Sequence, residues 1–203
     1  MKKFIIASNN AHKIKEIELI LKDLEIEVKS LKDEKIYIDV EEDGKTFEEN
    51  AKKKAEEIYK FLKKRGDKDF FVLADDSGLA VDYLNGDPGI YSARYAGEHG
   101  NDKKNNEKLL KELKDVPKEN RGAKFICQLA LFTDDESYYK VTGEVDGYII
   151  EELNGEGGFG YDPLFFYQPF KKTFGEISGE DKNKISHRAV ALKKLKDILK
   201  EIL

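Results

Sequence analysis

Two adjacent carboxylates, Asp75 and Asp76, are the side chains of this sequence best suited to metal or proton chemistry. They follow the apolar run 70–74, a predicted strand, and precede Ser77 and Gly78. A carboxylate inside a strand is costly to bury unless it binds a metal, a cation or a proton. Carboxylates at a strand end are common Mg2+ ligands. Because Asp, Ser and Gly also favour turns, a simple turn after the strand is the alternative.

A second polar cluster, Ser8 to Lys13, lies between a predicted strand over Lys3–Ala7 and a predicted helix. The first N–H groups of a helix and the positive end of its dipole favour an oxyanion, and Lys13 adds a cation. The segment is therefore suited to hold phosphate. It lacks the Gly-x-x-x-x-Gly-Lys-Ser/Thr pattern of a P-loop, and Ser or Asn before a helix is often only a cap, so capping is the alternative.

Two further acidic residues, Glu41 and Glu42, precede a helix that Thr46 is expected to cap. Acidic side chains in front of a helix complement its dipole, which is one interpretation of this pair. The other makes one of them a metal ligand that faces the carboxylates after the apolar run. We interpret the lysines at 52–54 of the same helix as its solvated face rather than as a binding patch.

A glycine-rich loop spans residues 154–163. It contains Gly155-x-Gly157-x-x-Gly160, but Pro163 and an apolar run follow it where a helix should start, so we do not interpret it as a dinucleotide fingerprint. Its glycines allow close backbone approach to a ligand, and Phe159 or Tyr161 offers a ring for stacking. Alternatively, this is a surface loop that its aromatic residues pin to the core.

Cationic donors gather near the start of the last predicted helix, at Lys182, His187 and Arg188. Ser186 is a plausible cap for that helix. Its dipole favours anions or carbonyl oxygens at this end, and the charged donors strengthen that preference. The alternative is a solvated helix start.

Composition limits the function classes. Of the 203 residues, 39% are hydrophobic and 38% are charged, with a net charge of −5, which is enough for a core and argues against a nucleic-acid partner. A polyanion would have to be held by a local basic cluster or a metal. The single cysteine, Cys127, excludes a disulfide framework, and its apolar neighbours predict a buried, inert thiol.

No signal peptide or membrane span is expected, because the start of the chain turns polar at Ser8 and no apolar run approaches ~18 residues. We therefore expect a cytoplasmic protein without a membrane partner. No repeat or linker separates parts of the chain, so residues 1–203 are predicted to form a single domain.

Strands and helices are predicted to be mixed along the chain. The two longest predicted strands form a hairpin, and the last helix has six apolar residues on its expected buried side: Val190, Leu192, Leu195, Ile198, Leu199 and Ile202. The other predicted elements are strands at Glu25–Leu31 and Ile36–Val40, a helix from Thr46 to Gly66, a helix at Asn101–Leu113, and the hairpin strands Ala123–Thr133 and Ser137–Ile150.

Six motifs, in order from Ser8 to Arg188, together resemble the inosine triphosphate pyrophosphatase family, also called XTP/dITP diphosphatases. One departure is Asn9, which stands where the family pattern has Gly and adds a side chain where backbone approaches phosphate. The motifs are Ser8-Asn9-Asn10-Ala11-His12-Lys13, Thr46-Phe47-Glu48-Glu49-Asn50-Ala51, Ala74-Asp75-Asp76-Ser77-Gly78-Leu79, Pro88-Gly89-Ile90-Tyr91-Ser92-Ala93-Arg94-Tyr95, Gly158-Phe159-Gly160-Tyr161-Asp162-Pro163 and Ile185-Ser186-His187-Arg188.

The resemblance implies an elongated, two-lobed α/β fold with a long central mixed sheet flanked by helices, an active-site cleft between the lobes, and a homodimer. It implies Mg2+ bound by Glu41 and Asp76, with Asp76 as proton acceptor; whether Asp75 or Asp76 touches the metal directly stays open. The implied substrate-binding residues are Ser8, Asn9, Asn10, Ala11, His12, Lys13, Ser77, Phe159, Gly160, Tyr161, Asp162, Lys182, His187 and Arg188.

The implied reaction is hydrolysis of ITP, dITP or XTP to the monophosphate and pyrophosphate. Asp76 would orient or deprotonate the attacking water, while Mg2+ and Lys13 stabilise the leaving pyrophosphate. The cationic donors would meet a 6-oxo purine and face the 6-amino donor of adenine unfavourably. Two alternatives stay open: a related pyrophosphatase acting on dTTP or UTP, and a nucleotide-binding sensor without turnover.

Overall fold

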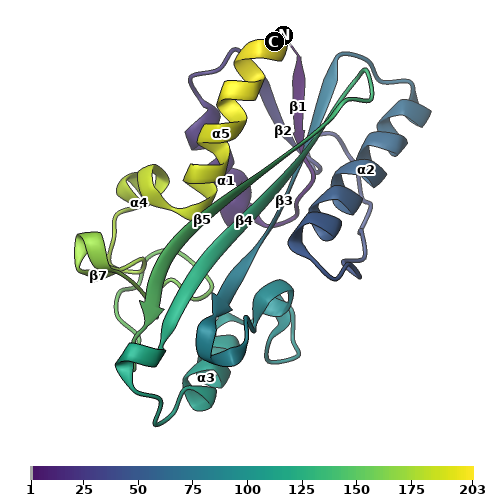
Figure 1. The fold of residues 1–203 in the computed structure, drawn as a ribbon. Helices are drawn as coiled ribbons and strands as arrows, with labels where there is room; N and C mark the ends of the chain where they lie inside the picture. Colours follow the sequence, from purple (N-terminus) through teal and green to yellow (C-terminus); the bar gives the residue numbers. More distant parts are fainter. Residues whose placement is uncertain (1) are drawn as a thin grey trace. The chain divides into compact units, whose positions relative to one another are not determined.

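A computed structural model describes residues 2–203 of the chain and shows a mixed arrangement of helices and strands (Figure 1). The strands are β1 (Lys3–Ile6), β2 (Glu27–Ser30), β3 (Phe70–Val81), β4 (Gly122–Thr133), β5 (Tyr138–Ile149), β6 (Phe165–Tyr167) and β7 (Lys172–Thr173). The α-helices are α1 (Ala11–Leu21), α2 (Phe47–Arg65), α3 (Asp102–Glu112), α4 (Gly179–Ile185) and α5 (His187–Ile202). Short 3-10 helices are η1 (Asp82–Leu84), η2 (Gly89–Arg94), η3 (Lys118–Asn120) and η4 (Gln168–Phe170).

All seven strands belong to one mixed sheet in the order β2-β1-β3-β4-β5-β6-β7. Strand β1 pairs in parallel with both β2 and β3, whereas β6 pairs antiparallel with β5 and β7. The predicted hairpin is present: β4 and β5 are neighbours, and the backbone N–H of Thr133 donates to the carbonyl of Ser137 across the turn. The parallel pairs need helical crossovers, and α1 and α2 supply them.

The chain divides into two compact units, each built from separate segments. The first unit comprises residues 1–76, 127–143 and 190–203, and the second comprises residues 77–126 and 144–189. Strands β3, β4 and β5 and helix α5 each contribute residues to both units. A single domain over residues 1–203 therefore stays a prediction.

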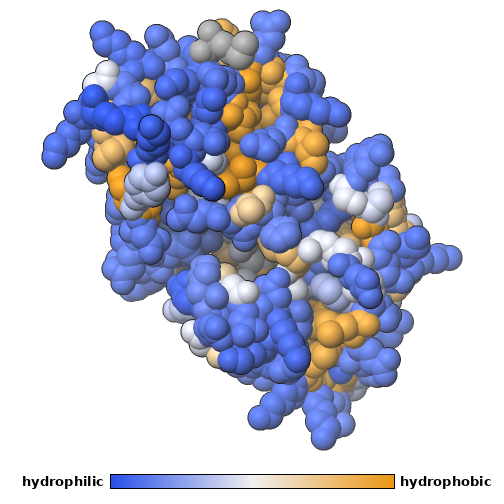
Figure 2. All heavy atoms as spheres, turned by 180° about the vertical axis from the view of Figure 1, so that it is seen from behind, coloured by the Kyte–Doolittle hydropathy of each residue, from blue (hydrophilic) through white to orange (hydrophobic). Residues whose placement is uncertain are grey.

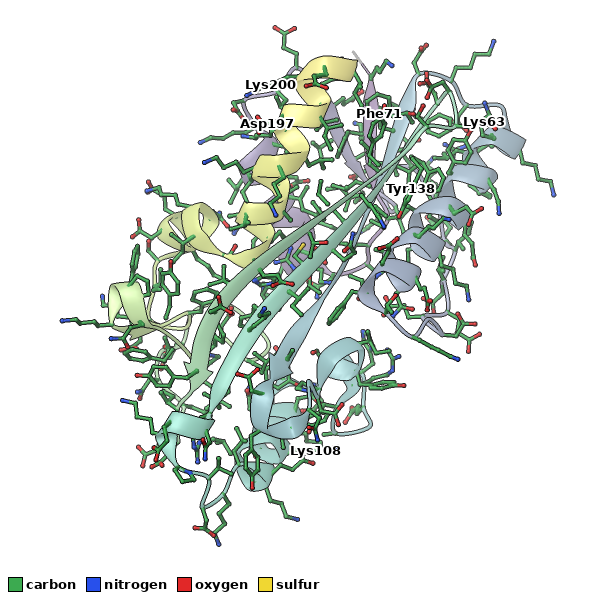
Figure 3. The ribbon with its side chains drawn as sticks, viewed as in Figure 1. Lys63, Phe71, Lys108, Tyr138, Asp197 and Lys200 are labelled. Carbon is green, nitrogen blue, oxygen red and sulfur yellow. The ribbon has the colours of Figure 1, made fainter. Side chains whose placement is uncertain are left out.

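The core of the first unit lies on both faces of its strands, because successive side chains of a buried strand point to opposite faces. On one face, Ile5, Val72 and Ala130 pack with residues of α2, including Ile58 and Leu62. The opposite face packs against α1 and α5, and Phe71, labelled in Figure 3, lies on that side. The opposite-face cluster consists of Phe4, Ile6, Ile17, Leu21, Phe71, Leu73, Cys127, Leu129, Leu131, Ala191, Leu192, Leu195 and Leu199.

Capping signals explain where α2 begins and ends. The hydroxyl of Thr46 accepts from the Glu49 N–H at 3.1 Å, and the Glu49 carboxylate accepts from the Lys45 N–H at 2.6 Å. Gly66 ends the helix in the left-handed conformation, with φ of 89°. The predicted helix over this segment is therefore confirmed, with its expected cap.

The last helix follows its prediction closely. The Ser186 hydroxyl accepts from the Ala189 N–H at 3.2 Å, as expected for a cap, while Val190, Ile198 and Ile202 are half-buried rather than fully buried. Its outer side is charged: Figure 3 labels Asp197 and Lys200, which form an exposed ion pair at 3.6 Å. Such exposed pairs contribute little to stability.

At three places the structure differs from what the sequence suggested. The turn considered at Asp75 and Asp76 does not occur, because β3 runs without interruption from Phe70 to Val81. Residues 36–40 form no strand. Helix α4 was missed, because its seven residues are too few for an apolar pattern; it is recognised by its cap, Ser178, whose hydroxyl accepts from the Asp181 N–H.

The surface agrees with the highly charged composition. Figure 2 shows hydrophilic side chains over most of the face it displays, with apolar residues gathered in smaller patches. Across residues 2–203, none of the helices combines the length and apolar character that crossing a bilayer requires.

Candidate functional site

The first unit contains a buried ion-pair network around the two adjacent aspartates of β3. Asp75 is fully buried, and the Lys13 ammonium lies 2.7 Å from its Oδ1 atom. The Cys127 thiol donates to the other oxygen, Oδ2, at 3.3 Å. Asp75 therefore already has a cation and a donor, which is how this fold compensates a charge inside a strand.

Asp76 is different, because one of its oxygens has no protein partner. It is 5% exposed, its Oδ1 atom lies 3.7 Å from the Lys54 ammonium, and its Oδ2 atom is buried without a hydrogen bond from residues 2–203. Burial raises the pKa of Asp76 above its usual value, although Lys54 and Lys13 act in the opposite direction. A buried oxygen without a donor fits a divalent cation, a water molecule or a proton.

Lys54 connects Asp76 to the acidic loop. Its ammonium lies 2.7 Å from Glu42 Oε1 and donates to the Asp75 carbonyl at 2.9 Å, and its side chain is only 12% exposed. Burial alone would lower the pKa of Lys54, but the charges of Asp76 and Glu42 raise it above the usual value, so the side chain stays charged. The interpretation of Lys54 as part of a solvated face was therefore wrong.

The structure places Glu42, rather than Glu41, beside this network. Glu41 is exposed, whereas Glu42 is partly buried and paired with Lys54. Among residues 2–203, no three His, Cys, Asp or Glu side chains are grouped as a metal site would require. Mg2+ keeps several waters and needs only one or two carboxylates, so the unpartnered oxygen of Asp76 still fits it.

The segment Ser8–Lys13 forms the entry to α1. Asn10 is the N-cap, and its side-chain oxygen accepts from the N–H groups of His12 and Lys13 at 3.0 and 3.1 Å. The Ser8 hydroxyl accepts from the Asn10 N–H at 3.1 Å. Asn9, Asn10, Ala11 and His12 are exposed, so a solute can reach this helix start. The capping alternative is thus present, and it leaves the Lys13 side chain directed at Asp75.

The second unit contains a separate cluster built on the glycine-rich loop. The Lys182 ammonium lies 2.6 Å from Asp162 Oδ2, and both side chains are less than 5% exposed. The same carboxylate oxygen accepts from the Phe159 N–H at 2.9 Å. Asp162 therefore joins the loop backbone to the cation, and the ammonium lies 4.8 Å from the centre of the Phe159 ring.

Of the other two donors at the start of α5, Arg188 approaches the same ring and His187 stacks on a different one. Arg188 is fully buried, its guanidinium carbon is 5.8 Å from the Phe159 ring centre, and it donates to the Ser77 hydroxyl at 3.3 Å. His187 is stacked on Phe125, with ring centres 4.7 Å apart and an interplanar angle of 11°. The alternative of a solvated helix start is thereby excluded for both residues.

The two aromatic residues of the loop have different environments. Tyr161 is buried and its hydroxyl donates to the Ser92 carbonyl at 2.8 Å, so it pins the loop to the core. Burial raises the pKa of Tyr161, so it remains a neutral donor. Phe159 is only partly buried, which leaves it the better candidate for stacking on a ligand. As predicted, no helix follows the glycines, since β6 comes next.

Gly158 makes a testable contribution to this arrangement. A Cβ atom there would lie 1.9 Å from Asp162 Oδ2, and the residue has φ of +76°. Gly158→Ala is therefore expected to displace Asp162 from Lys182 and to lower the free energy of unfolding by roughly 3 kcal/mol or more. Gly160→Ala is the matched control, because its φ is +63° but no atom lies within 4 Å, so it should cost only about 1–2 kcal/mol. Urea unfolding measures both, and equal losses would contradict this account of Gly158.

Comparison with known proteins shows the family. A model described as the Ham1 family matches residues 4–198. The chain is 63% identical over 203 residues to a dITP/XTP pyrophosphatase of Clostridium perfringens, covering 100% of both chains. It is 50% identical over 199 residues to a dITP/XTP pyrophosphatase of Bacillus subtilis, covering 98% of each.

Solved structures agree in sequence and in fold. The Ham1 protein of Staphylococcus aureus matches with a TM-score of 0.86 at 42% identity, covering 100% of both chains. A nucleoside-triphosphatase, dITP/XTP pyrophosphatase, of Mycobacterium abscessus matches with a TM-score of 0.74 at 41% identity, covering 95% of this chain and 98% of that one. The predicted α/β class with a mixed sheet is confirmed, as is the resemblance: the chain belongs to the Ham1 family.

Proposed function

We propose that this protein hydrolyses dITP, XTP and ITP to the nucleoside monophosphate and pyrophosphate. The observation that carries the proposal is Asp76, a buried carboxylate with one oxygen that has no partner among residues 2–203, beside two lysines that form ion pairs with Asp75 and Asp76. Relatives at 50–63% identity over the full length are dITP/XTP pyrophosphatases. A house-cleaning role in nucleotide metabolism follows from the substrates.

The phosphate end of the substrate would meet the residues around Asp76, as the resemblance implies. A nucleoside triphosphate carries about four negative charges, and attack at phosphorus requires that positive groups offset them. Lys13 supplies one such group at the exposed start of α1, and Lys54 supplies another beside Asp76. Asn9 and Ala11, which are exposed at this helix start, would add uncharged backbone donors.

Asp76 would hold the attacking water and take its proton as the water oxygen bonds to the α-phosphorus. The bond between that phosphorus and the bridging oxygen then breaks, and pyrophosphate leaves with the bridging oxygen. Asp76, with Glu41 as proposed or the closer Glu42, would hold Mg2+. When bound, Mg2+ would withdraw charge from the phosphate oxygens. Asp75 would serve as the counter-ion that positions Lys13.

The base end would meet Phe159 and the cationic donors near it, as the resemblance implies. Phe159 offers a partly exposed ring, and the donors of Lys182 and Arg188 lie close to it. A 6-oxo purine presents an acceptor to such donors, whereas the 6-amino group of adenine presents another donor. An unpaired buried donor costs about 1–3 kcal/mol, and more when it is charged. We therefore expect discrimination against ATP of at least about 10²-fold in kcat/KM.

A nucleotide panel tests the proposed function. Pyrophosphate release would be measured with dITP, XTP, ITP, ATP, GTP and dTTP, each with and without Mg2+. Fast release from the first three, dependent on Mg2+, is the expected result. Comparable rates for ATP would refute the assignment of the base-binding residues. A preference for dTTP would favour a pyrimidine pyrophosphatase, and binding without release would favour a sensor.

The assembly state is part of the same proposal. We infer a homodimer from the family resemblance, with no nucleic acid or membrane as partner. Light scattering after size-exclusion chromatography should give twice the mass of the chain; the mass of one chain would remove the dimer from the proposal.

A further inference from the structure

Asn50 of α2 is a buried polar residue that has no role in the mechanism above. It is fully buried, and its side-chain oxygen accepts from the Gly44 N–H at 2.8 Å. The fit is tight, since a Cβ atom on Gly44 would lie 2.6 Å from that oxygen. Asn50 therefore holds the end of the acidic loop 41–44 against the helix.

The side of α2 on which Asn50 lies is close to the hydrolytic residues. Asn50 precedes Lys54 by one helical turn, and side chains four residues apart lie on the same side of a helix. The Lys54 ammonium is 3.7 Å from Asp76 Oδ1, so this side of α2 lies next to Asp76. Two buried atoms there have no hydrogen-bond partner among residues 2–203: Asn50 Nδ2, a donor, and Asp76 Oδ2, an acceptor.

Leaving a donor and an acceptor buried and unsatisfied would be expensive for both groups. The cost is avoided if the Asn50 amide nitrogen donates to one lone pair of the Asp76 oxygen, which leaves the other lone pair for Mg2+ or water.

We propose that Asn50 is a positioning residue of the hydrolytic centre: its amide oxygen holds the acidic loop, and its amide nitrogen orients the Asp76 carboxylate. The Asn50 side chain thereby sets the positions of both the acidic loop 41–44 and the Asp76 carboxylate. The inference rests on the proposed function for its catalytic consequence. The contact itself is independent of that function.

Asn50→Asp separates the anchoring of the acidic loop from the orientation of Asp76. The substituted carboxylate keeps an acceptor for the Gly44 N–H but removes the donor that faces Asp76. If the amide orients Asp76, kcat for dITP should fall by about 10²-fold with KM changed less than about threefold, because small misplacements of a reacting group are costly. If Asn50 only anchors the loop, kcat should stay within threefold of the wild-type value, and the proposal fails.

Asn105→Asp is the matched control. Asn105 is likewise buried on a helix, where its oxygen accepts from the Ala96 N–H at 2.8 Å and its nitrogen donates to the Ala93 carbonyl at 3.3 Å. The same substitution there should leave kcat within about threefold of the wild-type value. A fall as large as that of Asn50→Asp would show that any buried Asn-to-Asp change disturbs turnover, which would overturn the proposal.

A double-mutant cycle with Asp76→Asn completes the test. If Asn50 acts through Asp76, Asn50→Asp should change the residual rate of Asp76→Asn less than about threefold; a further 10²-fold loss would overturn the proposal. The same cycle on the free energy of unfolding, measured without nucleotide, should also be non-additive. If wild-type protein releases no pyrophosphate, the proposed function fails, and this unfolding cycle still decides whether Asn50 and Asp76 interact.

Discussion

Asp76→Asn is expected to lower kcat for dITP by about 10³-fold or more, the largest effect of any single substitution in this protein. The amide has nearly the same shape but cannot accept the proton of the attacking water, and removing a positioned general base typically costs 10²–10⁴-fold. It also removes the charge that would help to hold Mg2+. Single-turnover measurement of pyrophosphate release is sensitive enough to quantify the residual rate.

The same variant should fold normally. The pKa of Asp76 is raised in the folded protein, so the folded state holds its proton more tightly than the unfolded chain. Stability is then lost as the pH rises from the ordinary carboxyl pKa through the raised value. Asn does not ionise, so Asp76→Asn should be at least as stable as wild type at neutral pH. Asp197→Asn, on the exposed side of α5, is the control and should change neither rate nor stability. A kcat within tenfold of wild type would remove Asp76 from the mechanism.

The second large effect is expected at the buried pair of Asp162 and Lys182. Breaking a buried ion pair by removing one partner typically costs about 3–5 kcal/mol, because the remaining charge is left uncompensated. Lys182→Met and Asp162→Asn should each lower the free energy of unfolding by about that amount, since both side chains are less than 5% exposed. Urea unfolding provides the measurement.

The double variant separates stability from selectivity. Asp162→Asn with Lys182→Met leaves no buried charge, so it should regain at least about 2 kcal/mol relative to the sum of the two single losses. It should not regain discrimination between dITP and ATP, because the cation near Phe159 is gone. Additive losses of stability would contradict the pairing, and intact discrimination would exclude Lys182 from base recognition.

Most of the fold was accessible from sequence where local and tertiary preferences agree. Helix α2 carries a cap at Thr46, an apolar stripe and a terminal glycine. The structure shows all three in their expected roles, as N-cap, buried face and C-cap. The failures came where packing overrides local preference. Asp75 and Asp76 resemble a turn, yet Lys13 and the neighbouring strands hold them inside β3.

The candidate site shows a similar division. The glycine-rich loop and the donors of the last helix were recognisable as polar interruptions, but the ion pair between Asp162 and Lys182 joins residues 20 positions apart and has no local signature. Lys54 was missed because it belongs to a run of lysines. A signal was present: Lys54 lies three and four residues from Ala51 and Ile58, on the buried stripe of α2 rather than its solvated face.

The spacing of residues in the sequence does not decide whether Glu41 or Glu42 is the metal ligand. In an irregular segment, no helical or strand periodicity indicates which of two adjacent side chains points inward. In the structure, Glu42 is the one that pairs with Lys54. Glu42→Gln and Glu41→Gln therefore form a matched pair for the metal assignment. The variant that raises the Mg2+ concentration for half-maximal activity by about tenfold identifies the ligand; if both leave it unchanged, neither residue holds the metal.

The central claim is that water attacks the α-phosphorus of a purine nucleoside triphosphate at Asp76. Hydrolysis of dITP in 18O-labelled water, followed by mass spectrometry of the products, tests it most directly. The account predicts one 18O atom in dIMP and none in pyrophosphate, with release lost in Asp76→Asn. Label in pyrophosphate would place the attack at the β-phosphorus, and labelled orthophosphate would indicate a phosphatase; either result would contradict the account.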